Sequence, residues 1–408
     1  MSAVTAATAS ARRDERRAAG VACGAHALHD GYTDLVYVML PVWQAEFGLA
    51  YAALGALRTL FSGTLAALQV PSSLLAQRLG APAVLALGTA LVGGAYLLAG
   101  ASSGLALLAL ALALGGAGAS TQHPLGSSMM AHAFAGRRSL KALGAYNFAG
   151  DVGKMAVPAV ASLLLVVMPW REALALLGGA GFVAAVAIFA LAPRFALDGG
   201  GKDGGAAAAE APARTDRVGF RTLLAVGMFD SAGRMAFLTF LPLLLAAKGA
   251  SLPVIGGALT AVFAGGAAGK LVCAFLGARI GAVRTVWLTE IMTAGGIVAI
   301  LPLPLEAVLA LLPLVGVALN GTSSVLYGSV PELVAPESRT RAFGVFYTGT
   351  VGAGALAPVL YGALADRVGI SSALVAVAAM VLVNVPLVAR LAPRLRSARG
   401  PGRGGNSA

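Results

Sequence analysis

The chain has 408 residues, of which 58% are hydrophobic and only 11% are charged, and its formal net charge is +12. Soluble domains carry about 25% charged residues, so the composition excludes an ordinary soluble enzyme or binding module. Uncharged runs long enough to cross a bilayer recur along the chain and predict an all-α integral membrane protein. The positive charge does not indicate a nucleic-acid partner, because Lys and Arg gather in the termini and in alternate loops, as topology signals do.

The first half of the chain predicts a basic cytoplasmic tail followed by six membrane-spanning helices. The tail covers residues 1–19, and the N-terminal six-helix bundle covers 20–192. Apolar runs between Gly, Pro and charge clusters set the limits of the helices. The predicted helices are 20–43, 51–76, 82–102, 104–132, 140–167 and 172–192.

The second half predicts a linker, six further helices and another basic tail. Residues 193–220 are rich in Gly and Ala, charged and without apolar periodicity, which predicts a flexible cytoplasmic linker. The C-terminal bundle covers 221–392, and a basic cytoplasmic tail covers 393–408. The predicted helices are 221–247, 252–277, 284–304, 307–333, 340–364 and 370–391.

The two halves repeat each other. Glycine, proline and arginine residues of the first half recur in the second half at a nearly constant spacing, which predicts two structurally related bundles. Matching pairs that lie 201 positions apart are Pro41 and Pro242, Gly55 and Gly256, Arg78 and Arg279, and Gly80 and Gly281.

This layout of two six-helix repeats around a central cytoplasmic loop resembles the major facilitator superfamily. The loop SSLLAQRLG keeps Arg78 and Gly80 of the superfamily's signature, but carries Gln77 where the family has an acid. The resemblance implies twelve transmembrane helices in two pseudo-symmetric six-helix bundles. It also implies a secondary active transporter that works by alternating access between the two bundles.

Three short motifs carry a closer resemblance. They are the pair His29-Asp30 in the first predicted helix, HPLGSS from His123, and NFAGDVGKM from Asn147. Together these motifs are similar to those of the fosmidomycin-resistance group of drug exporters. That resemblance implies proton antiport and drug efflux across a bacterial inner membrane.

Charged side chains at bilayer depth are costly and usually face a cavity. His26, Asp30, Asp34 and Tyr37 recur at helical spacing and form one stripe of the first predicted helix, beside His29. Buried Asp and His can exchange protons near physiological pH. We therefore predict a set of proton-coupling residues. They are Asp30, Asp34, His29, His123 and Asp151.

Cations on other helices are candidates to bind an anionic group of a substrate, since the Arg fork matches carboxylate or phosphonate. Two local pairs, Asp151 with Lys154 and Asp230 with Arg234, could instead only neutralise each other. Glu290 is expected to be structural, near the inner boundary of the membrane. The predicted substrate-binding residues are Arg58, Lys154, Arg234, Tyr37, Asn147, Asp230, Asn320 and Tyr327.

The sequence thus predicts a proton-coupled transporter of a small organic solute that we expect to be anionic, most simply an exporter by proton antiport. A proton-coupled uptake symporter of an organic anion is the first alternative. A divalent-metal transporter is the second, because His26, His29 and Asp30 combine imidazole and carboxylate. Adjacent His29 and Asp30 point about 100° apart on a helix, which disfavours that metal site.

The expected partners are a small-molecule substrate, protons and the lipid bilayer, and the chain is expected to be a monomer. Neither a cofactor, a bound metal, a nucleic acid nor an enzymatic activity is expected.

Overall fold

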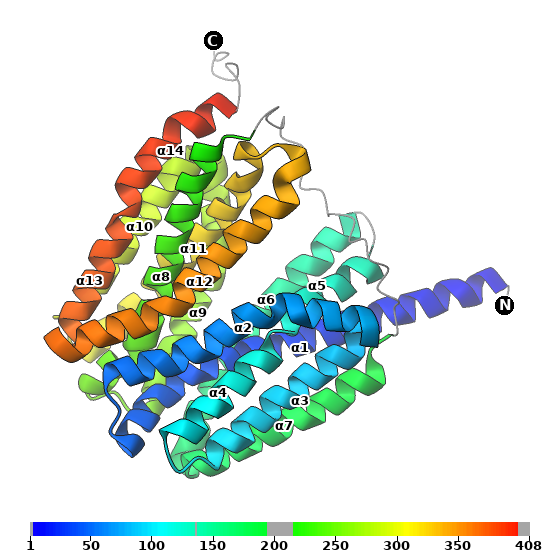
Figure 1. Cartoon of the computed structure of the whole chain (residues 1–408), viewed down its shortest axis with the longest axis horizontal. Helices are drawn as coiled ribbons and strands as arrows, with labels where there is room; N and C mark the ends of the chain where they lie inside the picture. Colours follow the sequence, from blue (N-terminus) through cyan, green and yellow to red (C-terminus); the bar gives the residue numbers. More distant parts are fainter. Residues whose placement is uncertain (1–2, 135–136, 194–214, 399–408) are drawn as a thin grey trace. The chain divides into compact units, whose positions relative to one another are not determined.

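The computed structural model describes residues 3–134, 137–193 and 215–398 (Figure 1). Every regular element in these ranges is a helix, and ten helices there are long and apolar enough to cross a membrane. The predicted fold class, an all-α integral membrane protein, is confirmed. Most of the predicted linker and the last ten residues of the predicted C-terminal tail lie outside the described residues.

The helices form two compact units (Figure 1). One unit contains α1–α7 together with Leu245–Thr260, and the other contains the rest of the described chain. The helices of the first half are α1 (Ala3–Phe47), α2 (Tyr51–Leu79), α3 (Ala81–Gly100), α4 (Leu105–Ala119), α5 (Gln122–Ala133), α6 (Arg137–Val167) and α7 (Trp170–Leu191). The helices of the second half are α8 (Arg217–Ala247), α9 (Leu252–Ile280), α10 (Ala282–Ala299), α11 (Leu305–Leu333), α12 (Arg339–Val368), α13 (Ile370–Leu382) and α14 (Asn384–Ala398), with a 3₁₀ turn at Pro336–Ser338.

Two predicted helices are each divided in two by a proline. The predicted span over 104–132 matches one candidate membrane span, Leu105–Ala133, but within it the structure separates α4 from α5 at Ser120 and Thr121, a break that the sequence analysis did not predict. Pro124 has no N–H to donate to the carbonyl of Ser120, so the regular bonding pattern is interrupted there. Pro386 likewise has no N–H to donate to the carbonyl of Leu382, and α13 is separated from α14 at this point.

The first helix is much longer than predicted. The predicted tail at 1–19 is helical from Ala3 onward, because its Ala, Arg and Glu residues are strong helix formers. No glycine or proline, the residues least favourable in a helix, precedes Gly20. Similarly, α14 continues to Ala398, inside the predicted C-terminal tail.

The backbone repeats between the two halves. Helix α9 begins and ends 201 positions after α2, and α10 begins 201 positions after α3. Gly80 and Gly281 precede α3 and α10 with φ of 85° and 86°, a left-handed conformation that favours glycine. The repeat inferred from the sequence therefore extends to the turns between the helices.

Among the long helices of the described residues, α1 and α10 are the two that are not apolar enough to count as candidate membrane spans. Both carry buried acids: Asp30 and Asp34 on α1, and Glu290 on α10. Each of these helices packs against several others, α1 against α5 and α6, and α10 against α11, α13 and α14. The polar groups that make these helices less apolar are thus enclosed by neighbouring helices.

Close approach of α1 and α6 depends on glycine. A Cβ atom at Gly153 would lie 1.8 Å from the carbonyl oxygen of Ala27, and one at Gly150 would lie 2.7 Å from the His26 ring. A side chain at either position would push α6 away from α1, because backbone and a packed ring cannot yield cheaply.

We therefore expect Gly153→Ala to destabilise the protein by about 1–3 kcal/mol or more, the usual cost of overpacking. Gly179→Ala is the matched control, since nothing lies within 4 Å of a Cβ at that helical glycine. The measurement is the apparent melting temperature of each purified variant in detergent. Equal melting temperatures for the two variants would contradict the close α1–α6 contact.

Asp216 is the N-cap of α8. Its carboxylate accepts hydrogen bonds from the N–H groups of Val218 and Gly219, and it pairs with Arg394 of α14 at 2.8 Å. Burial raises the pKa of this carboxyl group, but the Arg394 contact and the two N–H donors outweigh burial, so the pKa lies below its ordinary value. The end of the predicted linker is therefore an ordered helix cap.

A depressed pKa means that the Asp216 contacts stabilise the fold above the ordinary pKa of an aspartate, and that this contribution is lost as the pH falls. We expect Asp216→Ala to cost about 1 kcal/mol at neutral pH, as for other N-caps, because the partly exposed ion pair adds little. Asp216→Asn keeps the capping oxygen and should cost less. Unfolding of both variants from neutral to acidic pH tests this; an Asp216→Ala defect that stays constant in acid would rule it out.

Candidate functional site

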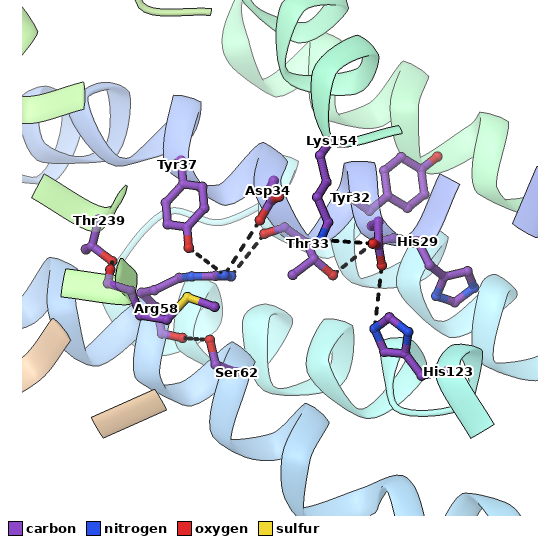
Figure 2. A network of polar contacts seen from close by, with 12 residues as sticks. His29, Tyr32, Thr33, Asp34, Tyr37, Arg58, Ser62, His123, Lys154 and Thr239 are labelled. Carbon is purple, nitrogen blue, oxygen red and sulfur yellow. Dashed lines mark hydrogen bonds and ion pairs between the residues drawn. The ribbon is translucent and has the colours of Figure 1, made fainter. Parts of the chain in front are cut away.

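Asp30 is the centre of a polar cluster inside the first unit. Its carboxylate lies 3.2 Å from Lys154 Nζ of α6, 3.3 Å from His26 Nε2 of α1 and 3.6 Å from His123 Nε2 of α5. In Figure 2, the side chains of Lys154 and His123 extend toward each other from opposite sides of the cluster. Only 9% of the Asp30 side chain is exposed, compared with 32% for Lys154 and 40% for His123. The acid is therefore enclosed while two of its partners remain accessible.

His26 is held in a defined orientation behind Asp30. Its Nδ1–H donates to the carbonyl of Tyr146 at 2.7 Å, since a carbonyl can only accept, and its ring stacks on the Tyr146 ring at 4.0 Å. The other ring nitrogen, Nε2, faces Asp30. The absence of a side chain at Gly150 leaves the space for this contact.

His29 has a different environment from His26. Its Nε2 lies 2.8 Å from the Thr89 hydroxyl of α3, and that hydroxyl donates its own proton to the carbonyl of Leu85. His29 must therefore donate to Thr89, which places a proton on Nε2. This arrangement ties α1 to α3 and directs His29 away from the contacts made by Asp30.

Arg58 lies in a second polar group on the same unit (Figure 2). Its guanidinium donates to the Thr33 carbonyl at 3.0 Å and to the Tyr37 hydroxyl at 2.9 Å, and lies 3.8 Å from Asp34. Arg58 also stacks on the Tyr37 ring at 4.4 Å and is only 1% exposed. In this arrangement the predicted anion-binding fork of Arg58 is occupied by groups of the protein itself.

The remaining predicted site residues divide between the two units. In the first unit, Asp151 is buried and interacts electrostatically with Lys154, but the ion pair of Lys154 is with Asp30; Asn147 is exposed. The second unit contains four others. They are Asp230, Arg234, Asn320 and Tyr327.

Those four residues take up different positions in the second unit. Asp230 is buried and Arg234 is half-buried one turn along α8. Asn320 donates to the Gly316 carbonyl of its own helix at 3.5 Å, and Tyr327 packs edge-on against Phe346.

The predicted site omitted two residues that the structure places at its centre. Helical spacing placed His26 on the same stripe as Asp30, but it was not included among the proton-coupling residues. Tyr146 is 120 positions away from His26 in the chain, and no sequence signal connects the two. Glu290, expected to be structural, has a buried carboxyl partner in Asp230.

His26, Asp30 and His123 also form a group whose ligand atoms all lie within 4.8 Å of one another. Imidazole and carboxylate ligands suit a divalent metal. However, the ammonium group of Lys154 already contacts the same carboxylate, and its charge opposes the binding of a dication. His29, the third residue of the alternative metal site, bonds to Thr89 instead. This chemistry fits a proton better than a metal ion.

Comparisons with known proteins agree with this architecture. The sequence profile of the Major Facilitator Superfamily matches residues 22–222 and 223–407. The chain belongs to this superfamily. This membership and the ten apolar helices of the described residues show a multi-pass membrane protein of a transporter family.

Three solved structures share the fold at low sequence identity. A bacterial homologue of the human lysosomal transporter Spinster, inward-facing and unoccupied, is 15% identical with a TM-score of 0.77, covering 95% of this chain and 99% of that one. Its occupied form is 14% identical with a TM-score of 0.71, covering 93% and 96%. The nucleoside transporter NupG is 13% identical with a TM-score of 0.74, covering 92% and 99%. No curated protein matches the sequence significantly.

The Arg58 contacts lead to a stability prediction. Removing one partner of a buried ion pair leaves the other charge uncompensated, so Asp34→Asn and Arg58→Gln should each destabilise the protein. The double variant should be less destabilised than the sum, with a coupling of about 0.5–3 kcal/mol. Unfolding in detergent of all four proteins measures this coupling.

The matched control is Asp34→Asn combined with Lys141→Gln, since Lys141 is exposed at the start of α6. That combination should be additive. Additivity in the Asp34–Arg58 cycle as well would mean that the two side chains do not support each other.

Proposed function

We propose that this protein is a proton-coupled secondary transporter of a small organic anion, in which Asp30 and Lys154 form the coupling pair. The observation that carries the proposal is the buried Asp30 carboxylate, 3.2 Å from an ammonium group that is itself partly accessible. A buried acid with one exposed cationic partner can exchange that partner for a proton. Alternating access between two repeats, as the superfamily suggests, would then carry proton and solute across the membrane.

His26 supports Asp30 as the proton-binding group. The hydrogen bond to Tyr146 keeps a proton on Nδ1, so neutral His26 directs the lone pair of Nε2 at a carboxylate oxygen 3.3 Å away. Two lone pairs that face each other repel, and a proton between them creates a charge-assisted hydrogen bond instead. This arrangement of His26 and Asp30 therefore favours the binding of a proton between them.

Lys154 supports an anionic substrate. While Asp30 is ionised, the ammonium group is held by it. Protonation of Asp30 removes that attraction and leaves a cation, with about a third of its side chain exposed, available to a carboxylate, phosphate or phosphonate. His123 lies on the accessible side of the same carboxylate and can donate a hydrogen bond to the same anion.

The sign of the coupling between proton and anion follows from the competition of ionised Asp30 and the anion for Lys154. If protonation of Asp30 promotes binding of the anion, the anion must promote binding of the proton by the same factor. Proton and anion are then carried together, which favours the symport alternative. Drug efflux by proton antiport, which the likeness to fosmidomycin exporters implies, needs the opposite sign, with substrate and proton excluding each other.

We further propose that the protein lies in a bacterial inner membrane with both termini in the cytoplasm. The support is the concentration of Lys and Arg in the termini and in alternate loops.

Transport by purified protein in liposomes tests the function. A panel of small carboxylates, organic phosphates, phosphonates, cationic drugs and divalent metals is first ranked by thermal stabilisation. The best anion should then accumulate in vesicles when the outside is acidic, and Asp30→Asn and Lys154→Gln should each reduce this proton-driven uptake at least tenfold. Lys141→Gln, an exposed lysine change on the same helix, should leave it intact.

Two outcomes of this assay oppose the proposal. Uptake driven by an acidic interior would establish antiport and reverse the proposed sign of coupling. Stabilisation by cations or metals but by no anion would remove Lys154 from substrate binding.

A further inference from the structure

The second unit contains a pair of buried acids that the coupling scheme does not use. Asp230 of α8 is 7% exposed and Glu290 of α10 is 2% exposed, and their carboxyl groups interact electrostatically with each other. Glu290 is the ninth of the eighteen residues of α10, so this interaction lies near the middle of the helix.

A hydrogen bond between two carboxyl groups requires a proton. An ionised carboxylate can only accept hydrogen bonds, so two ionised groups in contact would repel each other instead of bonding. Between two buried groups, that repulsion costs far more than it does at a surface. One proton shared between Asp230 and Glu290 removes the repulsion and supplies the missing donor.

The surrounding groups do not replace this proton. Glu290 Oε1 makes no hydrogen bond of good geometry among the described residues, and neither does either amide atom of Asn384, which lies beside Glu290 and is fully buried. Unsatisfied polar atoms around two acids indicate a site made to bind something small. A single proton between the two acids supplies the donor that these groups lack.

The internal repeat provides a second, independent observation. Adding 201 to His29 and to Thr89 gives Asp230 and Glu290, the same spacing that relates Gly80 to Gly281. In the first unit this position holds a hydrogen bond of 2.8 Å between His29 and Thr89. The architecture therefore places one donor and one acceptor here, and two acids meet that need when they hold one proton.

We propose that Asp230 and Glu290 bind one proton between them, forming a second proton site that is separate from Asp30. Among the described residues, the other charged or titratable groups that act on this pair are Arg234, one turn along α8, and Tyr327 of α11. Both of them interact with Asp230.

Infrared spectroscopy of the purified full-length protein tests this site without a substrate. A protonated carboxylic acid has a carbonyl stretch distinct from the bands of a carboxylate. At neutral pH, wild-type protein should show such a band, and Glu290→Gln and Asp230→Asn should each lose intensity equivalent to one carboxylic acid in difference spectra. Glu306→Gln, an exposed glutamate at the start of α11, is the control and should leave the band unchanged.

A second measurement guards against misfolded variants. Glutamine can donate to Asp230 as the protonated acid does, so Glu290→Gln should fold at neutral pH and remain stable when the pH rises. The wild type should lose apparent melting temperature at alkaline pH as the shared proton is removed, by a larger amount than the variant. Unchanged difference spectra for both variants, or equal loss of stability in alkali, would overturn the proposal. Neither result depends on whether the protein transports an anion.

Discussion

The cost of a charge at bilayer depth is the constraint on which the structure depends most. In the first unit, α1 carries Asp30, and that carboxylate is neutralised by Lys154 of α6, with histidines of α1 and α5 beside it. The contact is possible because Gly150 and Gly153 allow α6 to approach α1 closely. In the second unit, Asp230 interacts with Glu290 and with Arg234, one cation for two acids, and we assign the remaining neutralising charge to a proton. The acid of the first unit is thus neutralised by a side chain, and the acids of the second unit by a proton that can be released.

An ion pair between side chains and a shared proton respond differently to a solute. The Asp30–Lys154 pair can be opened by a proton on one partner or by an anion on the other, and Lys154 is accessible enough for such an exchange. The Asp230–Glu290 pair is almost completely enclosed, so its proton can leave only when the surrounding helices move apart. This distinction gives the first unit the role of recognising the solute in our account. It gives the second unit a proton whose affinity depends on how tightly its helices are packed.

The helices and their repeat could be predicted from the sequence because both depend on local information. Apolar runs give the spans, and landmark glycines such as Gly80 and Gly281 keep the same backbone conformation in both halves. The divisions before Pro124 and Pro386 were missed, although the missing N–H of a proline is visible in the sequence. The polar stripe of α1 was also predictable, since it follows helical spacing. Its partners were not: an i, i+3 spacing favoured Asp151 for Lys154, whereas the ion pair is made with Asp30, on another helix. Periodicity along one helix carries no information about which helix packs against it.

The central claim is that proton binding at Asp30 and anion binding at Lys154 promote each other. Its most direct test is the pH change of a weakly buffered solution of purified protein when the most strongly stabilising anion of the panel is added. The account predicts that the wild-type protein takes up protons on binding, and that Asp30→Asn takes up far fewer. Release of protons by the wild type, or the same uptake by both proteins, would contradict it.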